Sequence, residues 1–329
     1  MGARSTEVRR KKMEQSINFI LPGMYEHATL NLRLLQILNE HPEMFYPNVK
    51  VGAAYGNFQF CIFDGGRIFS QYRHTTVEEI SDIVKAYNSY GVPVRLIFTN
   101  PVVPETSFKN RFGQAVLKIC DNSQNEIVVN NPKFEEYLRE NYPDFGYISS
   151  TTKCLNTPDK FTEELDRDYK MICLDYNLNK NHKMLEAIPE EKRNKCEFLV
   201  NAICPPGCPN RKEHYRLNGL YSLSYGKPYA TQDCPILFNT LHPSQCGSHN
   251  NITPEEIYNV YAPKGFVNFK LEGRTLGIME NMCNYVKYMV KPEYQFYVMT
   301  LLLDEEGYDK VFYNDTVAII PRGFQQRVN

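Results

Sequence analysis

Two cysteines in a loop-like stretch are the residues whose type and spacing most directly suggest chemistry. Cys204 and Cys208 stand in the segment NAICPPGCPNR, directly after the apolar run CEFLV, and prolines lie next to both thiols. Cys234 and Cys246 follow downstream. Four thiolates are the ligand set of a [4Fe–4S] cluster. Cys204, Cys208, Cys234 and Cys246 are therefore candidate ligands of one such cluster.

Two alternatives stay open for these thiols. They also suit a tetrahedral zinc site, in which a histidine can replace one thiolate, and the candidates are His214, His242 and His249. The other alternative is that they are free cysteines in a loop. The stretch 205–264 favours a metal, because it is long and has little apolar periodicity, so a hydrophobic core alone would not hold it.

The remaining cysteines stand in a different setting. Four of them lie in apolar stretches, where cysteine usually acts as a small core residue: Cys61, Cys120, Cys173 and Cys283. Cys154 and Cys196 fit either a core or a site. We therefore expect the four cysteines in apolar stretches to take no part in metal binding.

A second candidate site is the segment VNFKLEGR, in which apolar and charged residues alternate. Val267, Phe269 and Leu271 share one phase, and the three charged residues Lys270, Glu272 and Arg274 share the other. In a strand, period-two alternation places the two sets on opposite faces. Charges inside a barrel must be paired or must face a ligand. We expect Lys270 and Glu272 to be catalytic and Arg274 to bind an anionic substrate group; the alternative is a structural ion-pair network in which Glu197 is the partner of Lys270.

Polar residues also follow several other apolar runs. Asp175 is a candidate for proton transfer, and the candidates for substrate binding are Tyr55, Asn100, Asn130 and Asn201. Each of them can also be explained as a turn or cap residue, which Asn and Asp commonly are. The functional interpretation depends on all of them meeting at one end of a barrel.

The elements that would bring these residues together are eight apolar runs separated by helical patterns. The runs begin near Asn18, Val49, Val92, Asn125, Phe145, Tyr169, Lys195 and Phe266. Between 61 and 69, CIFDGGRIF is typical of a small hairpin with Asp64-Gly65-Gly66 as its turn. Eight strands alternating with helices predict an α/β fold, a (β/α)₈ TIM-type barrel, with a cysteine-containing insertion between strands seven and eight. An open doubly wound sheet is the alternative, and the lack of a glycine-rich nucleotide-binding fingerprint counts against it.

The domain organisation follows from this pattern. We expect a flexible basic tail over 1–16, a barrel over 17–290 that includes the cysteine lobe 205–264, and a C-terminal extension over 291–329. The chain has 329 residues with 42% hydrophobic and 23% charged residues, which is typical of a globular protein. Its net charge of -1 implies no broadly basic nucleic-acid-binding surface, although nucleic acid is not excluded. With no apolar run that could span a membrane and no signal peptide, a cytoplasmic protein is expected.

At FLVNAICPPGCPNR and FKLEGR the sequence resembles the collagenase-like "unknown-type" peptidases, family thirty-two, which include proteins required for ubiquinone, transfer-RNA and ribosomal-RNA hydroxylation. The resemblance covers roughly 18–274. It implies a barrel whose upper rim carries a [4Fe–4S] cluster, on Cys204, Cys208, Cys234 and Cys246 here. It also implies hydroxylation without molecular oxygen, with an organic oxygen donor such as prephenate.

Three functional hypotheses follow. The first is an iron–sulfur enzyme of hydroxylase or oxidoreductase type that modifies a small organic molecule or a nucleotide, with an electron donor or partner protein. The second is a peptidase-type hydrolase, although neither a nucleophile elbow nor a His-Glu-x-x-His helix is present. The third is a non-catalytic metal-binding barrel that binds a partner.

Overall fold

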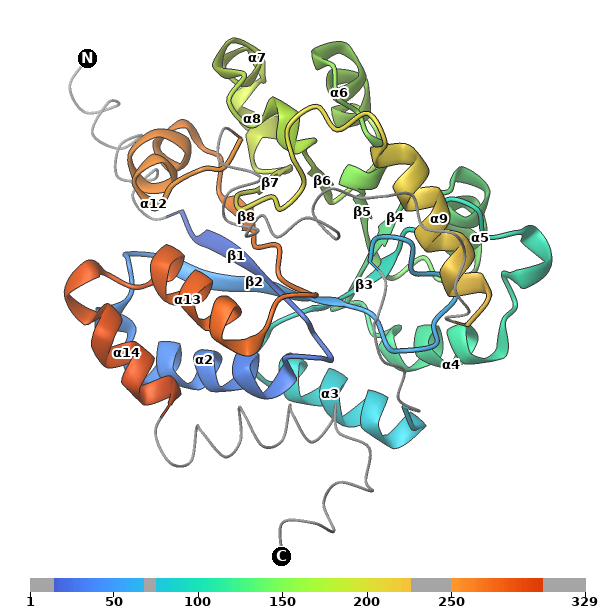
Figure 1. The fold of residues 1–329 in the computed structure, drawn as a ribbon, viewed down its shortest axis with the longest axis horizontal. Coiled ribbons are helices and arrows are strands. Elements are labelled where there is room, and N and C mark those ends of the chain that lie inside the picture. The colour runs from blue at the N-terminus through green and yellow to red at the C-terminus, as the bar shows by residue number, and fades with distance from the viewer. Residues whose placement is uncertain (1–14, 68–74, 226–249, 304–329) are drawn as a thin grey trace, which may run out of the picture.

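Eight parallel strands close into a barrel in the computed structural model, which describes residues 15–67, 75–225 and 250–303. Each strand pairs with its neighbours in chain order, and β8 closes the barrel against β1 (Figure 1). The strands are β1 (Ile17–Pro22), β2 (Val49–Gly56), β3 (Val94–Phe98), β4 (Glu126–Val129), β5 (Gly146–Ser149), β6 (Met171–Cys173), β7 (Cys196–Leu199) and β8 (Asn268–Lys270). The predicted (β/α)₈ barrel is confirmed.

Helices surround the barrel in Figure 1. They are α2 (Ala28–Glu40), α3 (Val77–Ser89), α4 (Arg111–Cys120), α5 (Pro132–Asn141), α6 (Pro158–Leu165), α7 (His182–Ala187), α8 (Glu190–Arg193), α9 (Arg211–Leu223), α12 (Pro254–Glu256), α13 (Ile278–Met289) and α14 (Gln295–Leu302). Short 3₁₀ turns η1 (Pro42–Met44), η2 (Glu105–Ser107), η3 (Thr151–Lys153), η4 (Tyr176–Leu178), η6 (Ala262–Lys264) and η7 (Pro292–Tyr294), and the π-helical η5 (Ile257–Tyr261), complete the described elements.

Side-chain caps fix where several helices begin. Thr76 and Glu79 form a capping box at the start of α3, and Asn110 and Asn131 accept backbone N–H groups at the starts of α4 and α5. Each cap satisfies donors that the first helical turn leaves unpaired. The capping residues therefore fix the first residue of each helix. Of the three, only α5 begins directly after its strand, since β4 ends at Val129 and α5 begins at Pro132.

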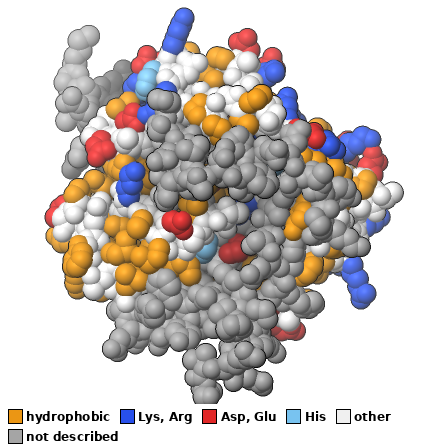
Figure 2. Space-filling model, viewed as in Figure 1, with side chains coloured by type: hydrophobic (Ala, Val, Ile, Leu, Met, Phe, Trp, Pro, Cys, Tyr) orange, Lys and Arg blue, Asp and Glu red, His pale blue; other side chains and the backbone are white. Residues whose placement is uncertain are grey.

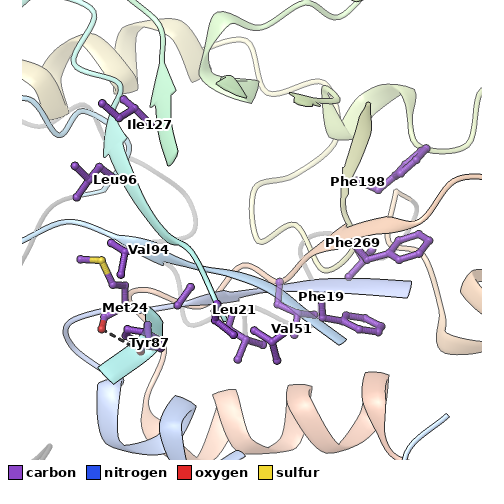
Figure 3. Packing of buried hydrophobic residues seen from close by; sticks show 14 of the residues in the cluster. Phe19, Leu21, Met24, Val51, Tyr87, Val94, Leu96, Ile127, Phe198 and Phe269 are labelled. Atoms are coloured by element: carbon purple, nitrogen blue, oxygen red, sulfur yellow. Dashed lines mark hydrogen bonds between the residues drawn. The ribbon is translucent and has the colours of Figure 1, made fainter. Parts of the chain in front are cut away.

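Apolar side chains pack on the outer surface of the barrel beneath the helices. Phe19, Phe198 and Phe269 come from β1, β7 and β8, and the ring of Phe269 lies 6.0 Å from that of Phe19 and 6.1 Å from that of Phe198, between centroids (Figure 3). A smaller apolar cluster fills the inside of the barrel: Ile20, Ala53, Tyr55, Ile97, Val128 and Ile148. The helices cover the outer face of the strands and the inner cluster covers the inner face, so the strands have few exposed positions.

A buried ion network lies inside the barrel among the strands. Arg95 of β3 is fully buried; its Nε donates to Glu126 of β4 at 2.6 Å, and its Nη1 donates to Glu197 of β7. Lys170, which is half exposed, pairs with the other Glu126 oxygen at 2.7 Å. Because burying an unpaired charge costs several kcal/mol, this set of opposite charges is what permits ionised groups in the barrel.

The predicted hairpin is not formed in the described part of its segment. Residues 61–67 form turns, and the backbone N–H of Asn100 donates to the carbonyl of Phe63 at 2.9 Å. A Cβ at Gly65 would lie 2.6 Å from the Asn100 Cα, so the chain packs tightly against the end of β3. Contact with β3, rather than pairing within the segment, determines its course.

The segment that returns to the barrel before β8 packs as part of the helical layer. Ile252, Ile257 and Tyr261 are buried in the main core, and the Tyr261 hydroxyl donates to the carbonyl of Asn179 at 2.7 Å. The end of the predicted insertion 205–264 therefore lies against the barrel.

Exposed apolar side chains gather on the face formed by α13 and α14. Met279, Phe296 and Tyr297 are the exposed large residues there, and Figure 2 shows hydrophobic side chains over these helices. No helix among residues 15–67, 75–225 and 250–303 is both long and apolar enough to cross a membrane.

Candidate functional site at the barrel mouth

A pocket of about 70 Å³ lies at the carboxyl ends of the strands. Five of the residues that the sequence singles out line it: Tyr55, Cys204, Lys270, Glu272 and Arg274. Arg67, Thr99, Ser150, Thr151, Tyr176 and Tyr215 contribute further polar groups. In TIM barrels this end of the strands carries the chemistry, because the βα loops converge there.

Strand β8 and the residues after it supply the three charges that the alternation predicts. Lys270, Glu272 and Arg274 all line the pocket and are buried, whereas Phe269 and Leu271 pack in the outer core. Only Lys270 lies within the strand itself; the other two follow its end. The period-two pattern thus places the three charged residues correctly.

Lys270 lies in an apolar and weakly compensated setting. Its Nζ lies 4.0 Å from the centre of the Tyr55 ring and 3.9 Å from Glu197 Oε1. It donates no hydrogen bond within the part of the chain that the structure describes. Burial lowers the pKa of Lys270, and the positive charges of Arg95 and Arg274 act in the same direction, against the opposing effects of Cys173 and Glu197. The neutral amine is therefore more accessible here than on a surface lysine.

Arg274 forms a buried pair with Asp64. Its Nη1 donates to Asp64 Oδ2 at 2.6 Å, its Nη2 lies 3.5 Å from Asp64 Oδ1, and both side chains are almost fully buried. Asp64 Oδ1 also accepts the backbone N–H of Gly66 at 3.0 Å. A Cβ at Gly66 would lie 2.9 Å from Arg274 Nη2, so glycine lets the loop approach the guanidinium. The pair joins the loop 61–67 to the end of β8.

Glu272 pairs with Arg67, a residue that the sequence interpretation missed. Glu272 Oε1 contacts Arg67 Nη2, and Glu272 Oε2 accepts the backbone N–H of Ile203 at 2.9 Å. Arg67 lies in the segment interpreted as a hairpin, so no strand-end pattern marked it. The only available signal was its position next to the Asp-Gly-Gly turn.

Asn201 does not line the pocket. Its Oδ1 accepts the Glu272 backbone N–H at 2.6 Å, and its Nδ2 donates to the Glu272 carbonyl at 2.9 Å. This reciprocal pair joins the chain after β7 to the chain after β8. Asn201 therefore positions Glu272 rather than contacting the pocket.

Asp175 acts as an anchor for α9. Its Oδ2 accepts from Arg211 Nη1 at 2.6 Å, and its Oδ1 accepts from the backbone and side chain of Asn177. Arg211 also donates to Thr151 and lies over the Tyr176 ring at 4.2 Å. With both oxygens engaged and no place in the pocket lining, Asp175 has the geometry of a structural group.

Asn100 and Asn130 likewise bind protein groups. Asn100 Nδ2 donates to the carbonyls of Ile62 and Gly219, and Asn130 Nδ2 donates to Thr152 Oγ1 at 2.8 Å. Tyr55 differs, because its ring lines the pocket while its hydroxyl donates to the Leu271 carbonyl at 2.8 Å. Of the predicted binding residues outside VNFKLEGR, Tyr55 alone is in the pocket.

One cysteine of the described pair borders the pocket. Cys204 lines it, and both Cys204 and Cys208 are partly exposed free thiols. Two contacts hold their loop: the Tyr176 hydroxyl donates to the Pro205 carbonyl at 3.2 Å, and the Gly207 N–H donates to Asn177 Oδ1 at 2.9 Å.

The rest of the predicted ligand set, Cys234, Cys246, His242 and His249, lies outside the described residues. Within those that are described, no group of three or more His, Cys, Asp or Glu side chains is arranged to hold a metal ion. The four-thiolate set stays a prediction.

Cys61, Cys120 and Cys173 are buried, as their apolar surroundings predict, and Cys196, for which the sequence left two possibilities, is buried too. Burial raises the pKa of the Cys61, Cys173 and Cys196 thiols to about 12, and it raises that of Cys120 as well. Cys154 is also buried. Cys283 is an exception to the prediction: it is exposed, because it lies on the outer side of α13, whose buried positions include Met282 and Tyr285.

No protein-family model and no curated protein matches the chain. A comparison with solved structures finds "The Structure of the U32 Peptidase Mk0906", with 15% sequence identity and a TM-score of 0.48. The match covers 79% of this chain and 94% of that one. The hydroxylase and hydrolase hypotheses both stay predictions after these comparisons.

Proposed function

We propose that the barrel mouth is an enzyme active site that binds a small organic anion. The observation that carries this proposal is the buried amine of Lys270. Within the described residues it donates no hydrogen bond, and its ion-pair contact with Glu197 Oε1 is long, at 3.9 Å. Arg67, Arg274 and Arg211 each pair with one carboxylate: Glu272, Asp64 and Asp175 respectively. The ion network of Arg95 and Lys170 with Glu126 and Glu197 is already balanced, so Lys270 adds one charge to it.

A bound anion would compensate that charge. A buried ammonium without a hydrogen-bonded counterion is costly, and an anion beside Lys270 Nζ would relieve that cost. Thr99 adds a group for orientation, because its buried hydroxyl has no hydrogen-bond partner in the described structure and the residue lines the pocket. The volume of about 70 Å³ suits a ligand of a few heavy atoms, or the charged end of a larger one.

We expect small carboxylates to raise the melting temperature of the protein and their neutral counterparts not to do so. Acetate and acetamide form a matched pair of nearly the same shape. Acetate at about a hundred times its dissociation constant should stabilise the fold by about 2.7 kcal/mol, or roughly 5 °C in melting temperature. Differential scanning fluorimetry at constant ionic strength measures this shift.

The control is a pair of lysine variants. Lys270→Met should abolish the acetate-dependent shift, and Lys85→Met, at an exposed lysine of α3, should retain it. Equal shifts with acetate and acetamide, or an undiminished shift in Lys270→Met, would rule out anion recognition by Lys270.

The second part of the proposal is a [4Fe–4S] cluster held by Cys204, Cys208, Cys234 and Cys246. Two features of the described pair support it: both thiols are free and partly exposed, and Cys204 borders the pocket. Such a cluster supplies a redox centre or a Lewis acid. The chain's own residues would bind the substrate anion and hold it at the rim where Cys204 lies. Oxygen-independent hydroxylation is the reaction that the resemblance at FLVNAICPPGCPNR and FKLEGR implies, and it would require an electron partner.

Anaerobically purified protein is expected to be brown and to contain iron and acid-labile sulfide. Cys204→Ser should strongly reduce both contents, because a serine hydroxyl is a poor replacement for a thiolate ligand. Cys283→Ser, at an exposed thiol of α13, should leave them unchanged. Colourless protein with stoichiometric zinc would replace the cluster with the zinc alternative, and metal-free protein would remove both.

A further inference from the structure

We infer that Lys270 reacts covalently, by condensing with the carbonyl carbon of a small 2-oxo acid to form an imine. The inference rests on the proposed function, because the carboxylate of the oxo acid is the anion that the pocket attracts. It adds the reacting group and the substrate class: a carboxylate next to a ketone or aldehyde.

The first observation is the position of the amine. Lys270 is the last residue of β8, and its backbone is in register with Ile20 of β1 and Leu199 of β7. Both flanking strands hold it, so its Cα is fixed on the closed barrel. Its side chain lines the pocket. A nucleophile on a rigid strand, facing a pocket, can be brought to a bound carbonyl in one orientation.

The second observation is that Lys270 Nζ is not held by a hydrogen bond to another described residue. Within residues 15–67, 75–225 and 250–303, Lys270 Nζ makes no hydrogen bond. It lies 4.0 Å from the centre of the Tyr55 ring and 3.9 Å from Glu197 Oε1. The other buried cations of the barrel, Arg95, Arg211 and Arg274, all donate to carboxylates. Lys270 is therefore the buried cation that remains free to react.

The third observation is the electrostatic environment. The titratable and charged groups that face Lys270 are Tyr55 from β2, Arg95 from β3, Cys173 from β6, Glu197 from β7 and Arg274 after β8. Burial and the two arginines favour the neutral amine, and Glu197 limits this effect. A desolvated lysine near other cations is the form in which an amine becomes a nucleophile towards carbonyl compounds.

The reaction balances without any further reagent. The ammonium first releases one proton to solvent, and the neutral amine nitrogen forms a bond to the carbonyl carbon. The carbonyl oxygen takes up two protons, one from that nitrogen and one from solvent, and leaves as water. This breaks the carbon–oxygen bond and leaves a protonated imine. One positive charge is present before and after. The iminium proton would face Glu197 Oε1, which accepts no hydrogen bond within the described structure.

Neighbouring donors can bind the carboxylate of the oxo acid. Arg67 and Arg274 both line the pocket, and a guanidinium has five N–H donors, of which the pair with Asp64 uses two in Arg274. Thr99 adds its unpartnered hydroxyl. A single 2-oxo acid could then place its carboxylate at these donors and its carbonyl group at Lys270.

The test is reductive trapping of the full-length protein with pyruvate and sodium cyanoborohydride, followed by peptide mass spectrometry. Lys270 is expected to be the main carboxyethylated lysine and to be modified at least about ten-fold faster than the exposed Lys85, because the pocket holds the carbonyl next to the amine. Acetone, which lacks the carboxylate, should show no preference for Lys270. Trapping is read on the wild-type protein, so it does not depend on how a variant folds.

Calorimetric titration with pyruvate and with lactate separates the two proposals. Lactate has the carboxylate but no carbonyl group, and Lys270→Arg keeps the charge but cannot form the imine. Binding of both acids, with trapping of Lys270 that Lys270→Arg abolishes, supports the inference. If both acids bind but Lys270 is labelled no faster than Lys85, the covalent step is wrong. The proposed anion site would remain supported. If neither acid binds, the anion site is wrong and the inference falls with it.

Discussion

Replacing Arg95 with methionine should lower the free energy of unfolding by about 3–5 kcal/mol. Arg95 is fully buried and donates to Glu126 of β4 and Glu197 of β7. Without it, two buried carboxylates lose their shared partner inside a closed barrel. The loss should shrink as the pH falls, because protonated carboxyl groups are less costly to bury than ionised ones. Urea unfolding at several pH values measures both effects.

The matched control is Lys170→Met. Lys170 pairs with the same Glu126 but is half exposed, so we expect a loss of no more than about 1 kcal/mol. If Arg95→Met unfolded at the wild-type urea concentration, the network would not be what holds the charged layer of the barrel.

Replacing Arg274 with methionine should also have a large effect. It should lower both the stability of the protein and its binding of acetate. It leaves Asp64 buried without its cation, at a cost of about 3–5 kcal/mol. It also removes a guanidinium from the pocket wall, so the acetate-dependent rise in melting temperature should be lost. Urea unfolding and ligand-dependent melting curves measure the two effects separately.

The double variant Asp64→Asn/Arg274→Met separates the two roles of Arg274. A neutral amide in place of Asp64 removes the stranded charge, so the double variant should be more stable than Arg274→Met alone. Anion binding should stay lost, since no guanidinium is restored. If the double variant recovered acetate binding, Arg274 would be a structural residue only.

The barrel and the charged segment of β8 could be predicted because both are encoded by local periodicity. Alternating Val267, Phe269 and Leu271 against Lys270, Glu272 and Arg274 fixes which set faces the helices. Eight buried runs separated by helices leave few other topologies. Local periodicity was enough to predict the strands, and the only non-local assumption was that the eight strands close into a barrel.

The partners of the pocket charges could not be predicted, because they come from distant parts of the chain. Asp64 and Arg274 are 210 positions apart, and Asp64 also had a plausible local role as a turn residue. Arg67 lies in the same segment, and nothing in the sequence pattern there marked it as a pocket residue. The Asp-Gly-Gly sequence is typical of a hairpin turn, but contact with the end of β3 determines its structure.

The protein contacts of the asparagines at strand ends could not be predicted for a related reason. Asn100 and Asn201 are both buried or half-buried at the expected end of the barrel, yet their side chains are occupied by backbone groups. An amide has both a donor and an acceptor, so it can join two loops as readily as it binds a ligand. Sequence alone does not distinguish these uses, whereas Lys270, which lacks such partners, stands out once the structure is known.

The most direct test of the central claim is to locate an anion in the barrel mouth. Crystals soaked in bromide give an anomalous signal that marks each bound halide. We predict a peak beside Lys270 Nζ in the wild-type protein and its absence in Lys270→Met. Bromide bound only at the outer surface, with none in the pocket between Lys270 and Arg274, would contradict the account.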